Sequence, residues 1–106
     1  MLRIVTLCCG LALTGGAALA QTETEAEKAD RCAALADVVA RTVTARQLGQ
    51  NASQAKRGLT SGEGAVAAKY APGVPPLVDW IYTLSEEQLS PELQTAFEKQ
   101  CLDYSG

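Results

Sequence analysis

The chain has 106 residues, of which 47% are hydrophobic and 20% are charged, so it is too apolar to remain disordered and long enough for one domain. Its formal charge of −3 argues against a nucleic-acid partner. Because it has no histidine, it lacks the commonest general base and the usual ligand of transition metals. We therefore expect a non-enzymatic protein without catalytic residues, metal ligands or cofactor.

The first twenty residues have the layout of a secretory signal peptide. Arg3 is followed by an apolar run, Ile4 to Leu13, and then by the small residues of Ala18-Leu19-Ala20 before Gln21. This run is shorter than the ~20 residues that a membrane-spanning helix needs. We expect cleavage after Ala20, export to the periplasm or beyond, and a single mature domain over residues 21–106 that makes no membrane contact.

Four cysteines divide between the signal peptide and the mature chain. Cys8 and Cys9 lie inside the apolar run, too early for a lipid-modified cysteine, and are expected to leave with the signal. Cys32 and Cys101 remain, and an even number of cysteines in an exported chain indicates a disulfide. Since they are 69 positions apart and lack the C-x-x-C spacing of catalytic dithiols, we interpret the bridge as structural. In the chain-entropy model, closing such a loop stabilises the fold by about 4 kcal/mol.

Helical periodicity predicts a first helix over residues 25–48. Gly49 is placed to end it in a left-handed C-cap, and Arg46 lies in its last turn. The apolar residues that share one face are Cys32, Leu35, Ala36, Val39 and Val43.

Residues 50–76 form a loop-rich middle segment, with four glycines and three prolines before the next strong helical pattern. Asn51 or Ser53 is expected to cap a short helix that runs through Arg57 and is stopped by Gly58. A second helix is expected to be capped by Ser61 and to continue to Ala71.

The remaining residues predict two more helical segments. Pro76 suits the first position of a helix whose core face carries Leu77, Ile81 and Leu84. Ser85 to Gln88 has the form of a capping box, and Ser90-Pro91-Glu92 opens a last helix. Its apolar side comprises Leu93, Ala96, Phe97, Cys101 and Tyr104. We therefore predict an all-α bundle of three to five helices, with the first and last helices joined by the Cys32–Cys101 disulfide.

Two features suggest a partner surface. Residues 38–62 carry four basic side chains and no acid, whereas residues 79–106 carry six acids and one lysine. These segments either face each other within the fold or contact a protein partner or another copy. Trp80 and Tyr82 point in different directions on a helix, so at least one is expected to be partly exposed. The candidate surface residues are Trp80, Tyr82, Arg41, Arg46, Lys56 and Arg57.

The remaining acidic residues do not form a recognisable site. Glu86 and Glu87 are adjacent and diverge by about 100° on a helix, so they do not make an acid–base pair. Together with Asp79 and Glu92 they lack the spacing of an EF-hand, so we do not expect a calcium site.

The stretches CAALADVVARTVTARQLG and LVDWIYTLSEEQLSPELQTAFEKQC resemble small, uncharacterised helical proteins that Gram-negative bacteria export. Those proteins have one cysteine early in the first helix and another near the C-terminus, and the resemblance implies no activity. In architecture the chain is more distantly similar to acid-stress periplasmic chaperones. We expect an exported protein acting through protein contacts, with an acid-activated holdase as the alternative and a small hydrolase as the third.

Overall fold

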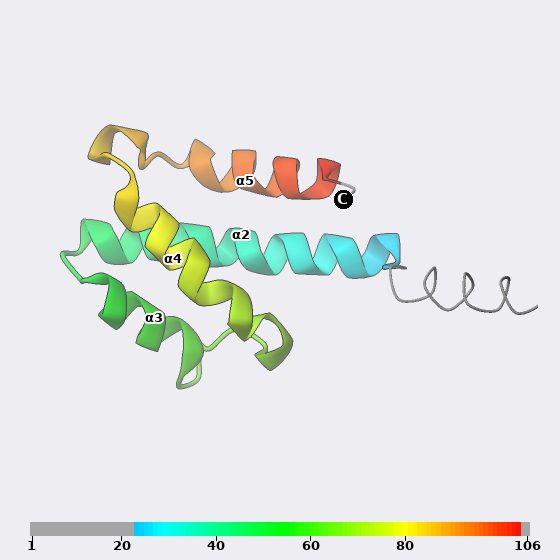
Figure 1. Ribbon diagram of the computed structural model, residues 1–106, viewed down its shortest axis with the longest axis horizontal. Coiled ribbons are helices and arrows are strands. Elements are labelled where there is room, and N and C mark those ends of the chain that lie inside the picture. The colour runs from blue at the N-terminus through cyan, green and yellow to red at the C-terminus, as the bar shows by residue number, and fades with distance from the viewer. Residues whose placement is uncertain (1–22, 105–106) are drawn as a thin grey trace, which may run out of the picture.

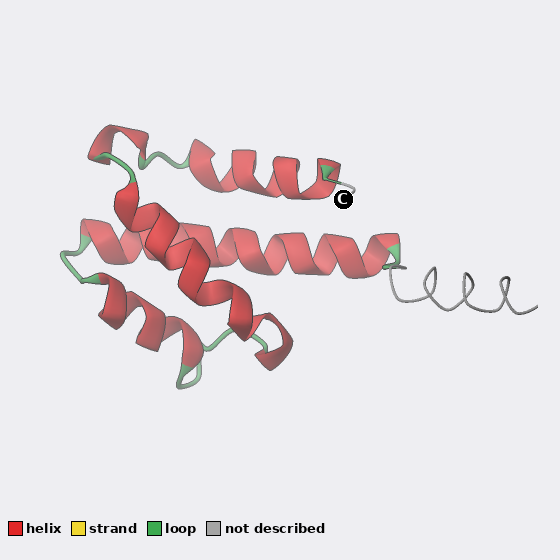
Figure 2. Cartoon of the chain, in the orientation of Figure 1, coloured by secondary structure: helices red, strands yellow, loops and turns green. Residues whose placement is uncertain are grey.

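The structure, a computed structural model, describes residues 23–104. These residues form helices and loops without any strand, which confirms the predicted all-α class (Figure 2). The helices are α2 (Glu25–Gln47), α3 (Ala52–Thr60), α4 (Val74–Thr83) and α5 (Glu92–Asp103), with the 3-10 turns η1 (Ala68–Gly73) and η2 (Glu86–Gln88). The predicted signal peptide, with Cys8, Cys9 and the cleavage site after Ala20, lies outside the described residues.

Helix α2 is the central element against which the others pack. It begins with a capping box between Thr24 and Glu27 and ends at Gln47. Gly49 follows with a φ of 87°, which confirms the predicted left-handed residue after the helix. At 23 residues, α2 is about 35 Å long and provides one continuous surface for α3, α4 and α5.

The disulfide joins the first and last described helices, as predicted. Helix α5 runs antiparallel to α2 along one side, and α4 crosses α2 (Figure 1). Cys32 and Cys101 are bonded with a Cα–Cα distance of 5.7 Å. The bridge therefore holds the C-terminal half of α5 against the N-terminal half of α2.

Two predictions for the middle segment are wrong. Asn51 caps α3 as expected, but the helix continues through Gly58 to Thr60. A helical glycine costs only about 1 kcal/mol, and burial of Leu59 offsets that cost. The expected helix from Ser61 to Ala71 is absent, because Gly62 turns the chain with a φ of 83°.

The segment after α3 returns to the core instead of forming a helix at once. The Val66 amide donates to the Leu59 carbonyl at 2.9 Å, and η1 then runs from Ala68 to Gly73 with Pro72 inside it. Helix α4 starts at Val74, two residues before the predicted Pro76. Both Pro75 and Pro76 fit in its first turn, where backbone N–H groups have no helical partner.

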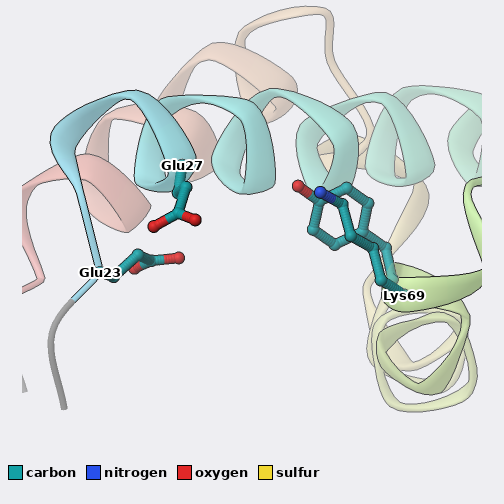
Figure 3. A pocket seen from close by; sticks show the side chains of 4 residues that line it. Glu23, Glu27 and Lys69 are labelled. Atoms are coloured by element: carbon teal, nitrogen blue, oxygen red, sulfur yellow. The ribbon is translucent and has the colours of Figure 1, made fainter. Parts of the chain in front are cut away.

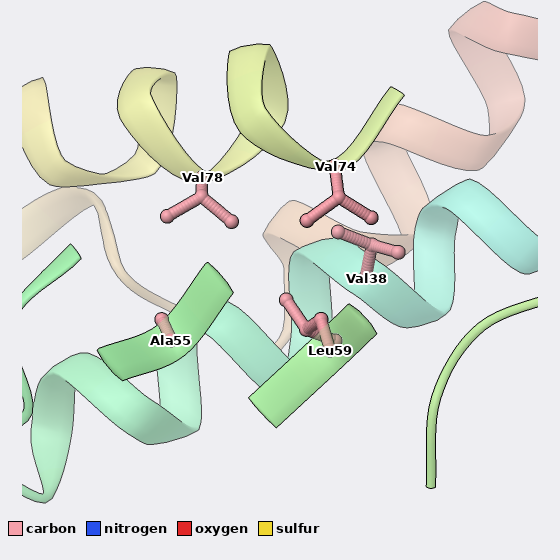
Figure 4. Packing of buried hydrophobic residues seen from close by; sticks show 5 residues of the cluster. All are labelled: Val38, Ala55, Leu59, Val74 and Val78. Carbon is pink, nitrogen blue, oxygen red and sulfur yellow. The ribbon is translucent and has the colours of Figure 1, made fainter. Parts of the chain in front are cut away.

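The buried core consists of two adjoining clusters on α2. The first joins α2, α3 and α4 and comprises Val38, Ala55, Leu59, Val74 and Val78 (Figure 4). The second comprises Val39, Ile81 and Leu89. Ile81 is fully buried as predicted, whereas Leu77 and Leu84 are only half-buried because Val74 and Val78 occupy the face towards α3.

Helix α5 contributes no fully buried residue. Leu93, Phe97 and Cys101 are half-buried, but Ala96 and Tyr104 are exposed, contrary to the prediction. The Ser85 capping box is present, whereas the start of α5 has no side-chain cap from Ser90. Because α5 packs mainly against α2, only one narrow stripe of it is covered.

Candidate functional site

An apolar groove lies between α4 and α5. Both helices rest on α2, meet at η2 and diverge from there (Figure 1). The space between them has a volume of about 450 Å³ and is open to solvent. We call it the α4–α5 groove, and its lining residues are Leu35, Gly73, Pro76, Leu77, Trp80, Phe97 and Gln100.

Two aromatic side chains meet across the α4–α5 groove. The ring centroids of Trp80 and Phe97 are 6.3 Å apart, with the planes inclined by 37°. Trp80 is 39% exposed, which confirms that at least one of the two aromatics of α4 is partly accessible. The groove therefore presents aromatic surface to solvent.

Gly73 brings the start of α4 close to α2 at the floor of the groove. A Cβ atom added at this glycine would lie 3.2 Å from Cδ2 of Leu35. A side chain here would push either Leu35 or the η1–α4 junction outward. Gly73 thus keeps Leu35, which lines the floor, in contact with the α4 wall.

Three of the four predicted basic surface residues interact within the fold. Lys56 pairs with Asp79 at 2.8 Å, so it links α3 to α4. Arg41 pairs with Asp37 along α2 at 3.6 Å. Arg46 donates to the Ile81 carbonyl at 2.7 Å. The structure therefore does not bring these side chains together as one exposed basic surface.

Tyr82 and Arg57 also lie away from the groove. The Tyr82 hydroxyl donates to the Gln50 carbonyl at 2.7 Å and so ties α4 to the α2–α3 connection. Arg46 stacks over the Tyr82 ring, with its guanidinium carbon 5.8 Å from the ring centroid. Arg57 is exposed on α3. Of the six candidate residues, only Trp80 lines the groove.

A smaller polar hollow of about 270 Å³ lies at the N-terminal end of α2. It is lined by Glu23, Glu27, Lys69 and Tyr70, with the two glutamates on one side and Lys69 on the other (Figure 3). The Glu27 carboxylate accepts from the Thr24 amide at 2.9 Å as part of the capping box. The Lys69 ammonium lies over the Tyr70 ring, 5.1 Å from its centroid.

The Glu23 carboxylate of this hollow is held by Arg31. Nε and Nη2 of Arg31 each donate to it at 2.9 Å. This hydrogen bonding lowers the pKa of Glu23 below its ordinary value and raises the pKa of Arg31. Nη1 of Arg31 lies 3.6 Å from Sγ of Cys101, beside the disulfide. Glu23 and Glu27 thus have roles in fixing the start of α2.

A third hollow, on α5, is lined by a threonine, a lysine and an aspartate, which are residue types found in hydrolytic sites. Thr95, Lys99 and Asp103 lie on one exposed face of α5, and Lys99 pairs with Asp103 at 3.4 Å. The side chains of this pair are 77% and 69% exposed. A catalytic lysine is normally activated by desolvation, which this face does not offer.

Within residues 23–104, no cluster of three or more His, Cys, Asp or Glu side chains is arranged to hold a metal ion. None of the described helices combines the length and the apolar character that crossing a bilayer requires.

Comparisons with protein-family models, with curated proteins and with solved structures find no match to this chain. The site is therefore interpreted from its own geometry. Sequence reasoning identified Trp80 and the apolar stripes of the helices, but it did not identify the groove. The groove depends on how far apart α4 and α5 lie on α2. This distance cannot be predicted from a local sequence pattern.

Proposed function

We propose that this is an exported, non-enzymatic protein that acts through protein–protein contacts made at the α4–α5 groove. The observation that carries the proposal is the open, uncharged lining of this groove, with Trp80 and Phe97 meeting across it. Contiguous apolar surface that remains in contact with water is typical of binding sites. Tryptophan and phenylalanine are enriched at protein interfaces.

The shape of the groove favours a polypeptide over a small ligand. Its volume of about 450 Å³ would fit a small molecule. Small-molecule sites, however, enclose about 70–90% of the ligand surface, and this groove is widely open to solvent. Two helices that diverge on a third resemble the grooves in which an amphipathic helix is bound by its apolar face.

The export part of the proposal rests on the sequence of residues 1–20 and on the disulfide. A disulfide persists in oxidising compartments such as the periplasm, whereas cytosolic thiols are kept reduced. The Cys32–Cys101 bridge also secures α5, which forms one wall of the groove. The same disulfide therefore supports one wall of the groove and favours an oxidising compartment.

Site-specific crosslinking in periplasm tests the proposal. A photoreactive phenylalanine analogue placed at Gln100, inside the groove, is expected to capture a discrete protein that mass spectrometry can identify. The same analogue at Thr95, exposed on another face of α5, is the matched control and should not capture it. Capture at neither position, together with turnover of a substrate from a hydrolase panel, would contradict the proposal.

An acid-activated holdase is the second candidate. The favouring observation is that the Glu23–Arg31 ion pair, which ties the residues before α2 to that helix, is lost when Glu23 is protonated. The disulfide survives this change, so the chain would loosen without separating α2 from α5. This candidate predicts suppression of client aggregation at about pH 3 and none at neutral pH. Equal suppression of client aggregation at both pH values would contradict the holdase function.

A further inference from the structure

We infer that an external dithiol reduces the Cys32–Cys101 disulfide by attacking Sγ of Cys101, and that this reduction opens the α4–α5 groove. The second part rests on the proposed function, because it names a regulation of the same groove. The bridge is the target of thiol exchange and not a catalyst, since its two cysteines lack the C-x-x-C spacing of catalytic dithiols.

The two cysteines of the bridge differ in accessibility. Cys32 lies on the buried face of α2 and is 0% exposed. Cys101 is half-buried near the end of α5, so part of it is in contact with solvent. The rate at which a thiolate attacks a disulfide depends on its access to the sulfur. Access therefore selects Sγ of Cys101 as the atom attacked, and Cys32 becomes the leaving group.

Arg31 places a positive charge beside the accessible sulfur. Its Nη1 lies 3.6 Å from Sγ of Cys101, while Nε and Nη2 each donate to the Glu23 carboxylate at 2.9 Å. A guanidinium at this distance attracts an incoming thiolate and stabilises the negative charge that the sulfur atoms share during exchange. Glu23 holds Arg31 in position, but its negative charge opposes the same attraction.

The exchange proceeds in two steps that consume one dithiol. The first thiolate of the dithiol bonds to Sγ of Cys101, the bond between the two protein sulfurs breaks, and Cys32 leaves as a thiolate that takes up a proton. The second thiolate of the dithiol then bonds to the first sulfur of that dithiol and releases Cys101 as a thiolate beside Arg31. The dithiol loses two electrons and becomes a disulfide, and the protein bridge gains them.

Reduction removes the covalent hold on the helix that forms one wall of the groove. Phe97 and Gln100, the lining residues that α5 contributes, lie in the last two turns of this helix, next to Cys101. Helix α5 has no fully buried residue, and Leu93 and Phe97 are its apolar contacts with the core. Without the bridge, these half-buried contacts alone hold α5. The helix therefore detaches from α2, and the groove loses its α5 wall.

The rate of reduction by dithiothreitol tests the role of Arg31, because two variants break the same ion pair with opposite changes of charge. Arg31→Gln should slow reduction about threefold, whereas Glu23→Gln should speed it about twofold. Arg57→Gln, at an exposed position of α3, is the control for net charge and should leave the rate unchanged. If the pair acted only by fixing the start of α2, both variants would change the rate in the same direction. That result, or wild-type rates in both, would overturn the inference.

The attacked sulfur is identified separately, in the wild-type oxidised protein. Glutathione is added, exchange is stopped with acid, and peptides are analysed by mass spectrometry. Glutathione should be attached to Cys101, with Cys32 as the free thiol. Adducts found mainly on Cys32, or in equal amounts on both cysteines, would overturn the inference.

Opening of the groove is measured on the reduced protein. Emission of Trp80, the only tryptophan of the chain, should move to longer wavelength, and amide hydrogens of residues 92–103 should exchange faster. If either is unchanged, the opening of the groove is overturned. The crosslinker at Gln100 should capture its partner in wild type but not in Cys32→Ala/Cys101→Ala, and capture that persists in this variant would contradict the regulation. Capture in neither protein would contradict the proposed function, whereas the reduction rates and Trp80 emission still decide this inference.

Discussion

Trp80 of α4 and Phe97 of α5 lie side by side across the α4–α5 groove, with ring centroids 6.3 Å apart. They form an aromatic contact between α5, which packs mainly on α2, and α4, which packs on both α2 and α3. The position of α5 relative to α4, and with it the shape of the groove, therefore depends on this pair and on the disulfide further along α5.

Removing the Phe97 ring should loosen the groove without unfolding the protein. Because Phe97 is half-buried, we expect Phe97→Ala to lower the free energy of unfolding by about 1–2 kcal/mol. Trp80 should become more accessible, so its emission maximum should move to longer wavelength and acrylamide should quench it more strongly. Leu102→Ala, which removes an exposed side chain from another part of α5, is the control. An unchanged Trp80 spectrum in Phe97→Ala would contradict the described contact.

The disulfide should matter more for α5 than for the rest of the chain. Since α5 has no fully buried residue, replacing both Cys32 and Cys101 by alanine should cost about 2–4 kcal/mol of stability. Amide hydrogens of residues 92–103 should then exchange much faster, while those in the middle of α2 stay protected. Uniformly faster exchange along the chain would show instead that the bridge supports the fold as a whole.

Replacing Gly58 and Gly49 by alanine should change the stability of the protein in opposite directions. Gly58 lies within α3, and a Cβ atom there meets nothing within 4 Å, so Gly58→Ala should stabilise the protein by about 0.5–1 kcal/mol. Gly49 has equally open space around it but a φ of 87°. Gly49→Ala should therefore destabilise the protein by about 1 kcal/mol through backbone strain alone. Urea unfolding measures both, and the same sign for both would be inconsistent with the described backbone.

The Glu23–Arg31 pair predicts a pH-dependent contribution to stability. The hydrogen bond from Arg31 lowers the pKa of Glu23 below 4.5 in the folded protein. Ionised Glu23 thus stabilises the fold above that pH, and its contribution disappears as the pH falls through the lowered pKa. Wild type should be more stable than Glu23→Gln at neutral pH, and the difference should vanish in stronger acid. A difference that grows on acidification would contradict the pairing.

The local features of the fold were predictable because they depend on neighbouring residues. Asn51 and Ser85 form capping boxes, Gly49 takes the left-handed conformation, and Cys32 lies on the buried face of α2. The predicted helix end at Gly58 was wrong because burial of Leu59 favours a longer helix. The predicted helix up to Ala71 was wrong because the chain turns at Gly62. These are tertiary effects that periodicity does not report.

The candidate site was less predictable than the fold. The sequence suggested that Arg41, Arg46 and Lys56 belong to one basic surface. In the fold, each of these side chains instead contacts a polar group of the same chain. Trp80 is partly exposed as expected, whereas Gly73 and Gln100 carried no sequence signal as groove residues. Their roles arise from where α4 and α5 rest on α2, which depends on the whole core.

The most direct test of the α4–α5 groove as the binding surface is an NMR map of the oxidised protein titrated with the protein that the crosslinker at Gln100 captures. The largest chemical-shift changes should fall on Leu35, Leu77, the Trp80 indole N–H, Phe97 and Gln100, and α3 should be unaffected. Changes centred on α3 or on the Thr95–Lys99 face of α5, or spread evenly over the acidic residues, would contradict the groove as the binding surface.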